Sequence, residues 1–189
     1  MQSTLMLIKP DGIEKNLEGP IKRMIEDAGL VVTHEKEIHP TRSHFEAHYA
    51  FDDEWKRNVG EGNLSLCEKM NIDPNEAFGT NDPIEIGDVI RDRLIEYMLS
   101  RPIKAFVIQG EDAIQRVRNL SGSTVPARAE PDTIRGRFGS DANEQPILEK
   151  RSIQNIVHTS GNFEEADFEL KHWFPELYSQ DLNYNPILS

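Results

Sequence analysis

His158 is the residue whose setting most clearly favours chemistry. It ends the short apolar run Ile156-Val157 and stands just before a predicted helix. Asn162 is the expected N-cap of that helix, and Glu165, three residues later, completes a capping-box pattern. The N–H groups and the dipole of a helix N-terminus favour an anion. The sequence therefore places an imidazole where a phosphoryl group can meet it.

The helix predicted over residues 163–174 has to hold this histidine. Apolar residues recur along it at helical spacing and predict one buried stripe: Phe163, Ala166, Leu170, Trp173 and Phe174. The opposite side carries Glu165, Glu169 and Lys171. Because a single histidine near a helix cap is most often polar surface, the rest of the chain has to support the chemical interpretation.

Lys9 is a second side chain placed for chemistry. Residues 4–8 are all apolar after Thr4 and predict a strand buried on both faces. Lys9-Pro10-Asp11-Gly12 then ends the strand with turn residues. Functional groups often gather at strand ends, although a lysine there can also simply extend its charged head to the surface.

Periodicity and turn residues predict the other elements. Further strands are expected at Leu30–Ile38, Ile103–Ile108 and Ile153–Val157. Helices are expected from Gly19 to Ala28, after a Ser43–Glu46 capping pair, from the N-cap Asp88 to Arg101, and from Asp112 to Leu120. Residues 51–87 show weak periodicity and turn signals such as Gly60-Glu61-Gly62, with a short helix at 63–70, and 121–150 reads as a long loop.

This order predicts the fold class α+β. With the two middle helices interpreted as a helical hairpin appendage, the core is a ferredoxin-like split βαβ with a four-stranded antiparallel sheet. We interpret residues 1–189 as a single domain with two insertions, at about 52–87 and 139–149.

Composition limits the classes of function. The formal net charge of −12 and the pI of about 4.9 argue against a general nucleic-acid grip, but not against a polyanionic small molecule bound by local cations. Cys67 is the single cysteine in the sequence, so neither an internal disulfide nor a cysteine metal cluster is expected. We find no signal-peptide pattern and no membrane span, and we expect a cytoplasmic protein.

Taken together, the motifs resemble those of the nucleoside diphosphate kinase family over nearly the whole chain apart from the two insertions. They are, in order, Lys9-Pro10-Asp11-Gly12, Tyr49, residues 118–124 (RNLSGST), Thr133-Ile134-Arg135-Gly136, residues 155–160 (NIVHTS) and Glu169. The resemblance implies an enzyme that transfers the terminal phosphoryl group of a nucleoside triphosphate, typically ATP, to a nucleoside diphosphate. The transfer would run in two half-reactions through a phosphohistidine.

The same resemblance assigns the chemical centre. His158 would be the nucleophile, Glu169 with Ser160 would orient its imidazole, and Tyr49 would sit beside the histidine and its phosphoryl group. Lys9 would lie near the transferred group. An imidazole suits this role because it is neutral and nucleophilic near pH 7.

The nucleotide contacts follow in the same way. Arg118 and Arg135 would clamp the diphosphate, and Thr124 would donate its hydroxyl to a phosphate oxygen. Lys9 and Asn155 would hold the ribose hydroxyls. Mg²⁺ is implied as cofactor, held mainly by the nucleotide phosphates rather than by protein ligands.

The sequence departs from the family pattern at a few positions. The aromatic residue expected to stack on the base falls on Ile90 when aligned back from Met98, and near Trp55 or Arg57 when aligned forward from Tyr49. Gly161 stands where many members carry aspartate. The insertions leave open the assembly, expected to be a homo-oligomer (hexamer or tetramer), and whether the first is a lid or an interface.

Two other functions remain as alternatives. One is a nucleotide-binding regulatory protein of the same fold with weak turnover. The other is a nucleic-acid binder, because a ferredoxin-like sheet can present aromatic side chains to RNA, but the acidic charge argues against it.

Overall fold

A computed structural model describes residues 1–178, which form two compact units. The sheet unit comprises Met1–His39, Arg101–Ser140 and residues 155–178, and the helical unit comprises Pro40–Ser100 and Asp141–Gln154. Both predicted insertions lie almost entirely in the helical unit. Our interpretation of the chain as one domain stays a prediction.

The sheet unit is built on four antiparallel strands. They are β1 (Gln2–Ile8), β2 (Val31–Ile38), β3 (Ile103–Gly110) and β4 (Val157–Thr159), in the spatial order β2-β3-β1-β4. This confirms the predicted ferredoxin-like sheet. The predicted bounds of the last strand, Ile153–Val157, are wrong. Ile156 has a φ of 68°, outside the range of a strand residue, and β4 begins only after it. His158 consequently lies inside β4 rather than after it.

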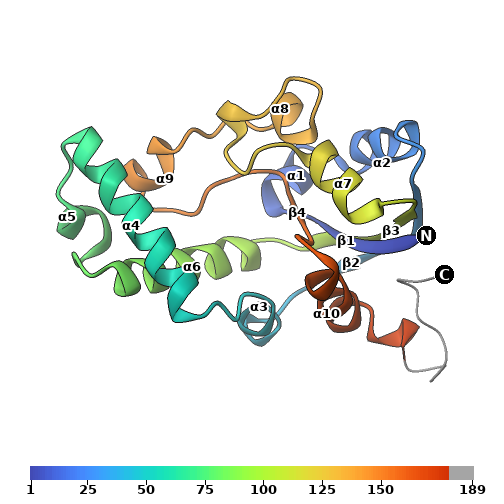
Figure 1. Ribbon diagram of the computed structural model, residues 1–189, viewed down its shortest axis with the longest axis horizontal. Coiled ribbons are helices and arrows are strands. Elements are labelled where there is room, and N and C mark those ends of the chain that lie inside the picture. Colours follow the sequence, from blue (N-terminus) through green and yellow to red (C-terminus); the bar gives the residue numbers. More distant parts are fainter. Residues whose placement is uncertain (179–189) are drawn as a thin grey trace. The chain divides into compact units, whose positions relative to one another are not determined.

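Helices cover the sheet on both faces (Figure 1). The sheet unit contains α1 (Pro10–Glu14), α2 (Glu18–Asp27), α7 (Ala113–Ser121), α8 (Ile134–Phe138), α10 (Phe163–Trp173) and the 3-10 turns η1 (Pro126–Arg128) and η2 (Pro175–Leu177). Met6 and Ile8 of β1 share a buried apolar cluster with Ile25 of α2 and Val117 of α7. The strand of residues 4–8 is buried on both faces, as predicted.

Helix α10 begins as expected but buries a different face. The Asn162 side chain accepts the Glu165 N–H at 2.8 Å, which confirms the N-cap. Phe163 is 40% exposed, so its predicted place in the buried stripe is wrong. Glu169, which the pattern put on the opposite side, is buried instead. Its burial is possible because polar partners satisfy its carboxylate, as described below.

The helical unit is built from α3 (Arg42–His48), α4 (Asp53–Met70), α5 (Pro74–Phe78), α6 (Pro83–Leu99) and α9 (Glu144–Leu148). The predicted short helix at 63–70 is the last part of α4, and the predicted loop at 121–150 contains η1, α8 and α9. A second apolar cluster joins α4, α5, α6 and α9 through Cys67, Phe78, Ile86 and Ile147. Across residues 1–178, every helix is too short or too polar to cross a membrane.

Two predicted N-caps in this unit are wrong. Helix α6 begins after Asp82, whose side chain accepts the N–H groups of Ile84 and Glu85, and not after Asp88. Pro83 occupies its first turn, where a missing N–H costs nothing.

Helix α3 is capped by Thr41 in a reciprocal capping box with His44, rather than by the predicted Ser43–Glu46 pair. The histidine ring supplies the acceptor that a Glu or Gln usually provides in this motif.

Two glycines let α4 and α6 pack closely. A Cβ on Gly60 would lie 1.9 Å from the carbonyl oxygen of Pro83, and a Cβ on Gly87 would lie 2.6 Å from the Cα of Lys56. Gly62, two positions after Gly60, has no atom within 4 Å of the Cβ that a larger residue would carry. The sequence pattern treats both glycines of α4 as turn signals, whereas one of them is a packing contact.

These positions give a matched pair of variants. We expect Gly60→Ala to destabilise the protein by about 2 kcal/mol or more, because backbone atoms must separate to admit a methyl group. Gly62→Ala should stabilise it by about 0.5–1 kcal/mol, since alanine suits an exposed helix position better than glycine. Urea unfolding followed by circular dichroism measures both. Equal effects of the two substitutions would contradict the close crossing of α4 and α6.

Candidate active site

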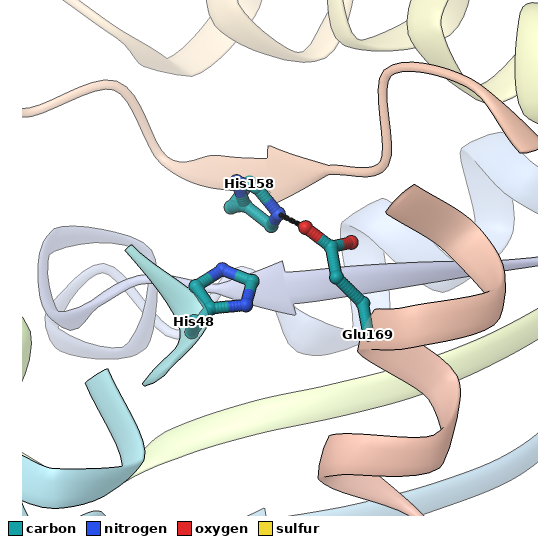
Figure 2. A group of neighbouring side chains, drawn as sticks. All are labelled: His48, His158 and Glu169. Carbon is teal, nitrogen blue, oxygen red and sulfur yellow. Dashed lines mark hydrogen bonds and ion pairs between the residues drawn. The ribbon is translucent and has the colours of Figure 1, made fainter. Parts of the chain in front are cut away.

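The imidazole of His158 is held by a buried carboxylate. Its Nε2 lies 2.7 Å from Glu169 Oε1 (Figure 2). The Ser160 hydroxyl donates to Glu169 Oε2 at 2.6 Å. Because an ionised carboxylate only accepts, Nε2 is the protonated nitrogen and the lone pair of the neutral ring is on Nδ1. The structure therefore brings together three predicted site residues in the arrangement of an oriented nucleophile.

The sheet fixes the position of this triad. His158 pairs with Leu7 across β4 and β1, and the Ser160 hydroxyl accepts the Leu5 N–H at 3.4 Å. Glu169 projects from α10, and its side chain is 6% exposed, against 20% for His158. The carboxylate is thus almost fully removed from water, while the imidazole keeps an accessible edge.

Lys9 and Asn155 meet beside β4. The Lys9 Nζ donates to Asn155 Oδ1 at 2.7 Å, and Asn155 Nδ2 donates to the backbone carbonyl of Thr124 at 2.8 Å. Burial, and then the nearby charge of Arg135, lower the pKa of Lys9 to about 7, while Asp11 opposes the shift. Lys9 therefore titrates near neutral pH, which an exposed lysine does not.

Arg135 joins this group from α8. Its guanidinium donates to three backbone carbonyls: Nε to Asn155 at 3.1 Å, Nη1 to Gly122 at 2.7 Å and Nη2 to Val157 at 2.8 Å. Burial and the charge of Arg118 lower its pKa to about 10, so that it remains a cation at neutral pH. The side chain predicted as a phosphate clamp is also a structural tie between three segments.

Lys9 and Arg135 form a buried cationic cluster, and the guanidinium of the exposed Arg118 lies near it. Burial is the larger cause of both lowered pKa values; repulsion by Arg135 adds to it at Lys9, repulsion by Arg118 adds to it at Arg135, and Asp11 opposes both shifts. A bound polyanion would relieve this repulsion. The sheet unit therefore has buried cations that could bind an anion close to β4, the strand that carries His158.

Arg118 extends from α7 toward the start of α10. If Gly161 carried a Cβ, that atom would lie 2.9 Å from Arg118 Nη1 and 2.7 Å from Glu165 Oε2. The Glu165 carboxylate in turn accepts the Gly161 N–H at 2.7 Å. Gly161, which departs from the family's aspartate, leaves this space to a carboxylate from the helix. The capping-box pattern singled out Glu165 in the sequence, but it did not predict that the Glu165 carboxylate lies beside Gly161.

Two predicted site residues lie in the helical unit. Tyr49 is buried at the end of α3, and its backbone carbonyl accepts Arg91 Nε at 2.7 Å. Ile90 packs from α6 against the apolar cluster of that unit. The indole of Trp55 stacks on Phe51 with ring centroids 3.6 Å apart. Their predicted contacts with a nucleotide stay predictions.

Sequence reasoning overlooked Asp11. It was interpreted only as a turn residue, yet it is 4% exposed and accepts the Ile156 N–H at 3.1 Å. A charged residue inside a short motif that follows a buried strand was the available signal, since buried carboxylates are rare unless paired.

Comparison with known proteins identifies the family of this chain. A family model described as nucleoside diphosphate kinase matches residues 2–58 and 87–178. It leaves out 59–86, a stretch inside the first predicted insertion. The nucleoside diphosphate kinase of Pyrobaculum aerophilum is 36% identical over 176 residues, which cover 93% of this chain and 96% of that protein.

Solved structures match as well. A crystal structure of an NDP kinase from Pyrobaculum aerophilum superposes with a TM-score of 0.88 at 34% identity, covering 92% of this chain and 95% of that one. A nucleoside-diphosphate kinase from Borrelia burgdorferi, solved as a transition-state mimic with vanadate and ADP, gives a TM-score of 0.73 at 27% identity, covering 97% and 92%. The chain belongs to the nucleoside diphosphate kinase family.

Proposed function

We propose that this protein is a nucleoside diphosphate kinase that works through a phosphohistidine at His158. It would take the γ-phosphoryl group of a nucleoside triphosphate, typically ATP, and pass it to a nucleoside diphosphate. The observation that carries the proposal is the hydrogen bond of His158 Nε2 to the buried Glu169, in a strand that adjoins the cluster of Lys9, Asn155 and Arg135.

In the first half-reaction, the Nδ1 lone pair of His158 attacks the γ-phosphorus. A nitrogen–phosphorus bond forms, the bond from the γ-phosphorus to the β,γ-bridging oxygen breaks, and that oxygen leaves as part of the nucleoside diphosphate. Positive charge develops on the imidazole and is stabilised by the Glu169 carboxylate through Nε2–H. In the second half-reaction, a terminal oxygen of the acceptor diphosphate attacks the phosphohistidine and the ring nitrogen leaves.

The cations supply the electrostatic part of the catalysis. Arg118 and Arg135 would bind the diphosphate oxygens, with the Thr124 hydroxyl as a further donor. Lys9 and Asn155 would hold the ribose hydroxyls, and Lys9 would also face the transferred phosphoryl group. Because Lys9, Asn155 and Arg135 are fixed by hydrogen bonds before substrate binds, these three side chains would need little reorganisation in the transition state.

The side chains of the cluster fit a magnesium nucleotide. They are mainly cations, and its carboxylate, Asp11, already accepts a backbone N–H. Such a set suits phosphate oxygens, with Mg²⁺ held by the nucleotide rather than by the protein. When bound, the ion would neutralise phosphate charge during transfer.

Tyr49 is proposed to lie beside the phosphoryl group and Ile90 near the base, with Trp55 as the alternative for base stacking. The homo-oligomeric state, as a hexamer or tetramer, and the cytoplasmic location are also proposed from the family resemblance. Analytical ultracentrifugation of the full chain tests the assembly, and a monomer at micromolar concentration would contradict it.

Radiolabelling tests the central step. With ATP labelled at the γ-phosphate, we expect the protein to acquire an acid-labile label that a nucleoside diphosphate then removes. The His158→Ala variant should acquire no label, because the attacking nitrogen is gone. His34→Ala, a histidine on the exposed strand β2, is the matched control and should behave as the unchanged protein. Nucleotide binding without any label on the unchanged protein would instead indicate the regulatory alternative.

The pKa of Lys9 predicts proton uptake on nucleotide binding. At pH 8 a lysine with a pKa of about 7 is mostly neutral. Phosphate oxygens favour its charged form and raise that pKa, so binding should take up close to one proton at pH 8 and almost none at pH 6. Nucleotide affinity should accordingly fall as the pH rises above 7. Calorimetry of ADP binding in buffers with different ionisation enthalpies measures the uptake.

Lys9→Met provides the control for this measurement. It keeps the length of the apolar stem and removes the titrating amine, so the uptake at pH 8 should disappear. An undiminished uptake in this variant would assign the proton to another group.

A further inference from the structure

Ile156 has a backbone conformation that its side chain disfavours. Its φ is 68°, in the left-handed region, and its β-branched side chain is fully buried. The Val157 N–H bonds to the Asn155 carbonyl at 2.7 Å, which closes a three-residue γ-turn around Ile156. This turn stands directly between Asn155 and the strand that carries His158. A left-handed residue other than glycine persists only when its surroundings hold it there.

The motif that follows β1 holds this peptide at both ends. The Asp11 carboxylate accepts the Ile156 N–H at 3.1 Å, and the Lys9 N–H donates to the Ile156 carbonyl at 2.8 Å. A Cβ on Gly12 would lie 3.0 Å from that carbonyl and 2.7 Å from Ile8 Cγ2, so a larger residue would push the turn away. The motif at residues 9–12 therefore holds the backbone of Ile156 in addition to contributing Lys9 to the site.

The γ-turn determines which groups face the site. The backbone carbonyls of Asn155 and Val157, on either side of Ile156, both accept hydrogen bonds from the guanidinium of Arg135. The same reversal brings the Asn155 side chain to Lys9 Nζ. If residue 156 relaxed to an extended conformation, these carbonyls and the Asn155 amide would separate.

We propose that Asp11 is a positioning residue for phosphoryl transfer. Its hydrogen bond to the Ile156 N–H keeps the γ-turn closed and thereby sets Asn155 against Lys9 and His158 in its place in β4. Asp11 acts through the backbone and touches neither the nucleotide nor the reacting atoms. This inference rests on the proposed function, because the reaction to be positioned is the phosphorylation of His158.

The first test separates chemistry from binding. With Asp11→Ala we expect the single-turnover rate of His158 phosphorylation at saturating ATP to fall about tenfold or more, as the disfavoured turn opens. The Kd for ADP should rise by a smaller factor than the rate falls, because Asn155 and Lys9 lose their contact while the cations themselves remain. Asp11→Asn keeps an oxygen to accept the Ile156 N–H and should stay within about threefold of the unchanged rate. Equal losses in Asp11→Ala and Asp11→Asn would overturn the proposal.

Substitution at position 156 provides a rescue that a general loss of stability cannot imitate. Ile156→Gly and Ile156→Ala remove nearly the same buried side chain, but glycine alone adopts a φ of 68° without a steric cost. In the Asp11→Ala background, Ile156→Gly should therefore restore the phosphorylation rate at least about fivefold over Ile156→Ala. Equal rates in the two double variants would overturn the proposal.

If the Asp11→Ala variant does not fold, the two double variants still test the positioning role of Asp11. A folded Asp11→Ala, Ile156→Gly protein beside an unfolded Asp11→Ala, Ile156→Ala protein supports the positioning role. Failure of both to fold overturns it. With Asp11 unchanged, the Ile156→Gly protein should also melt at a higher temperature than Ile156→Ala. The unchanged protein is labelled in the same experiments, so absence of its own label overturns the proposed function rather than the role of Asp11.

Discussion

The constraint on which the sheet unit depends is the burial of positive charge without enough negative charge to balance it. Lys9 and Arg135 are buried near β4, and Arg118 lies close to Arg135. The lowered pKa values of Lys9 and Arg135 reflect the free-energy cost of burying their charges. Backbone carbonyls satisfy the hydrogen bonds of Arg135 but do not neutralise it. A protein that keeps such a cluster in its folded state gives up stability for a site already organised to accept a polyanion.

The imidazole beside this cluster is prepared in the opposite manner. The neutral ring of His158 donates its Nε2–H to the carboxylate of Glu169, which Ser160 also contacts, and this hydrogen bond fixes which ring nitrogen carries the proton. In the proposed reaction the two environments would serve different parts: the cations would stabilise the charge that substrate brings, and the carboxylate would stabilise the charge that develops on the ring.

Sequence reasoning succeeded where local pattern and three-dimensional role coincide. The buried strand of β1 follows from periodicity and the Asn162 cap from capping chemistry. The contacts among Lys9, Arg135 and Asn155, and of Glu169 with His158, join residues that the family resemblance had singled out together. It failed where a residue has one local preference and another tertiary role. Gly60 stands in a glycine-rich sequence that is typical of a turn, but it lies where α4 and α6 pack closely. The 18-residue helix α4 was therefore not predicted over its full length.

Ile156 shows the limit of local pattern most clearly. Isoleucine in an apolar run predicts an extended strand, and nothing within five residues signals a left-handed backbone. The group that stabilises this conformation is Asp11, 145 residues earlier in the chain. A conformation imposed over such a separation is invisible to periodicity and visible only in coordinates. Disagreement between a residue's preference and its backbone is therefore itself a signal, because it marks the place where distant side chains were recruited to hold a functional geometry.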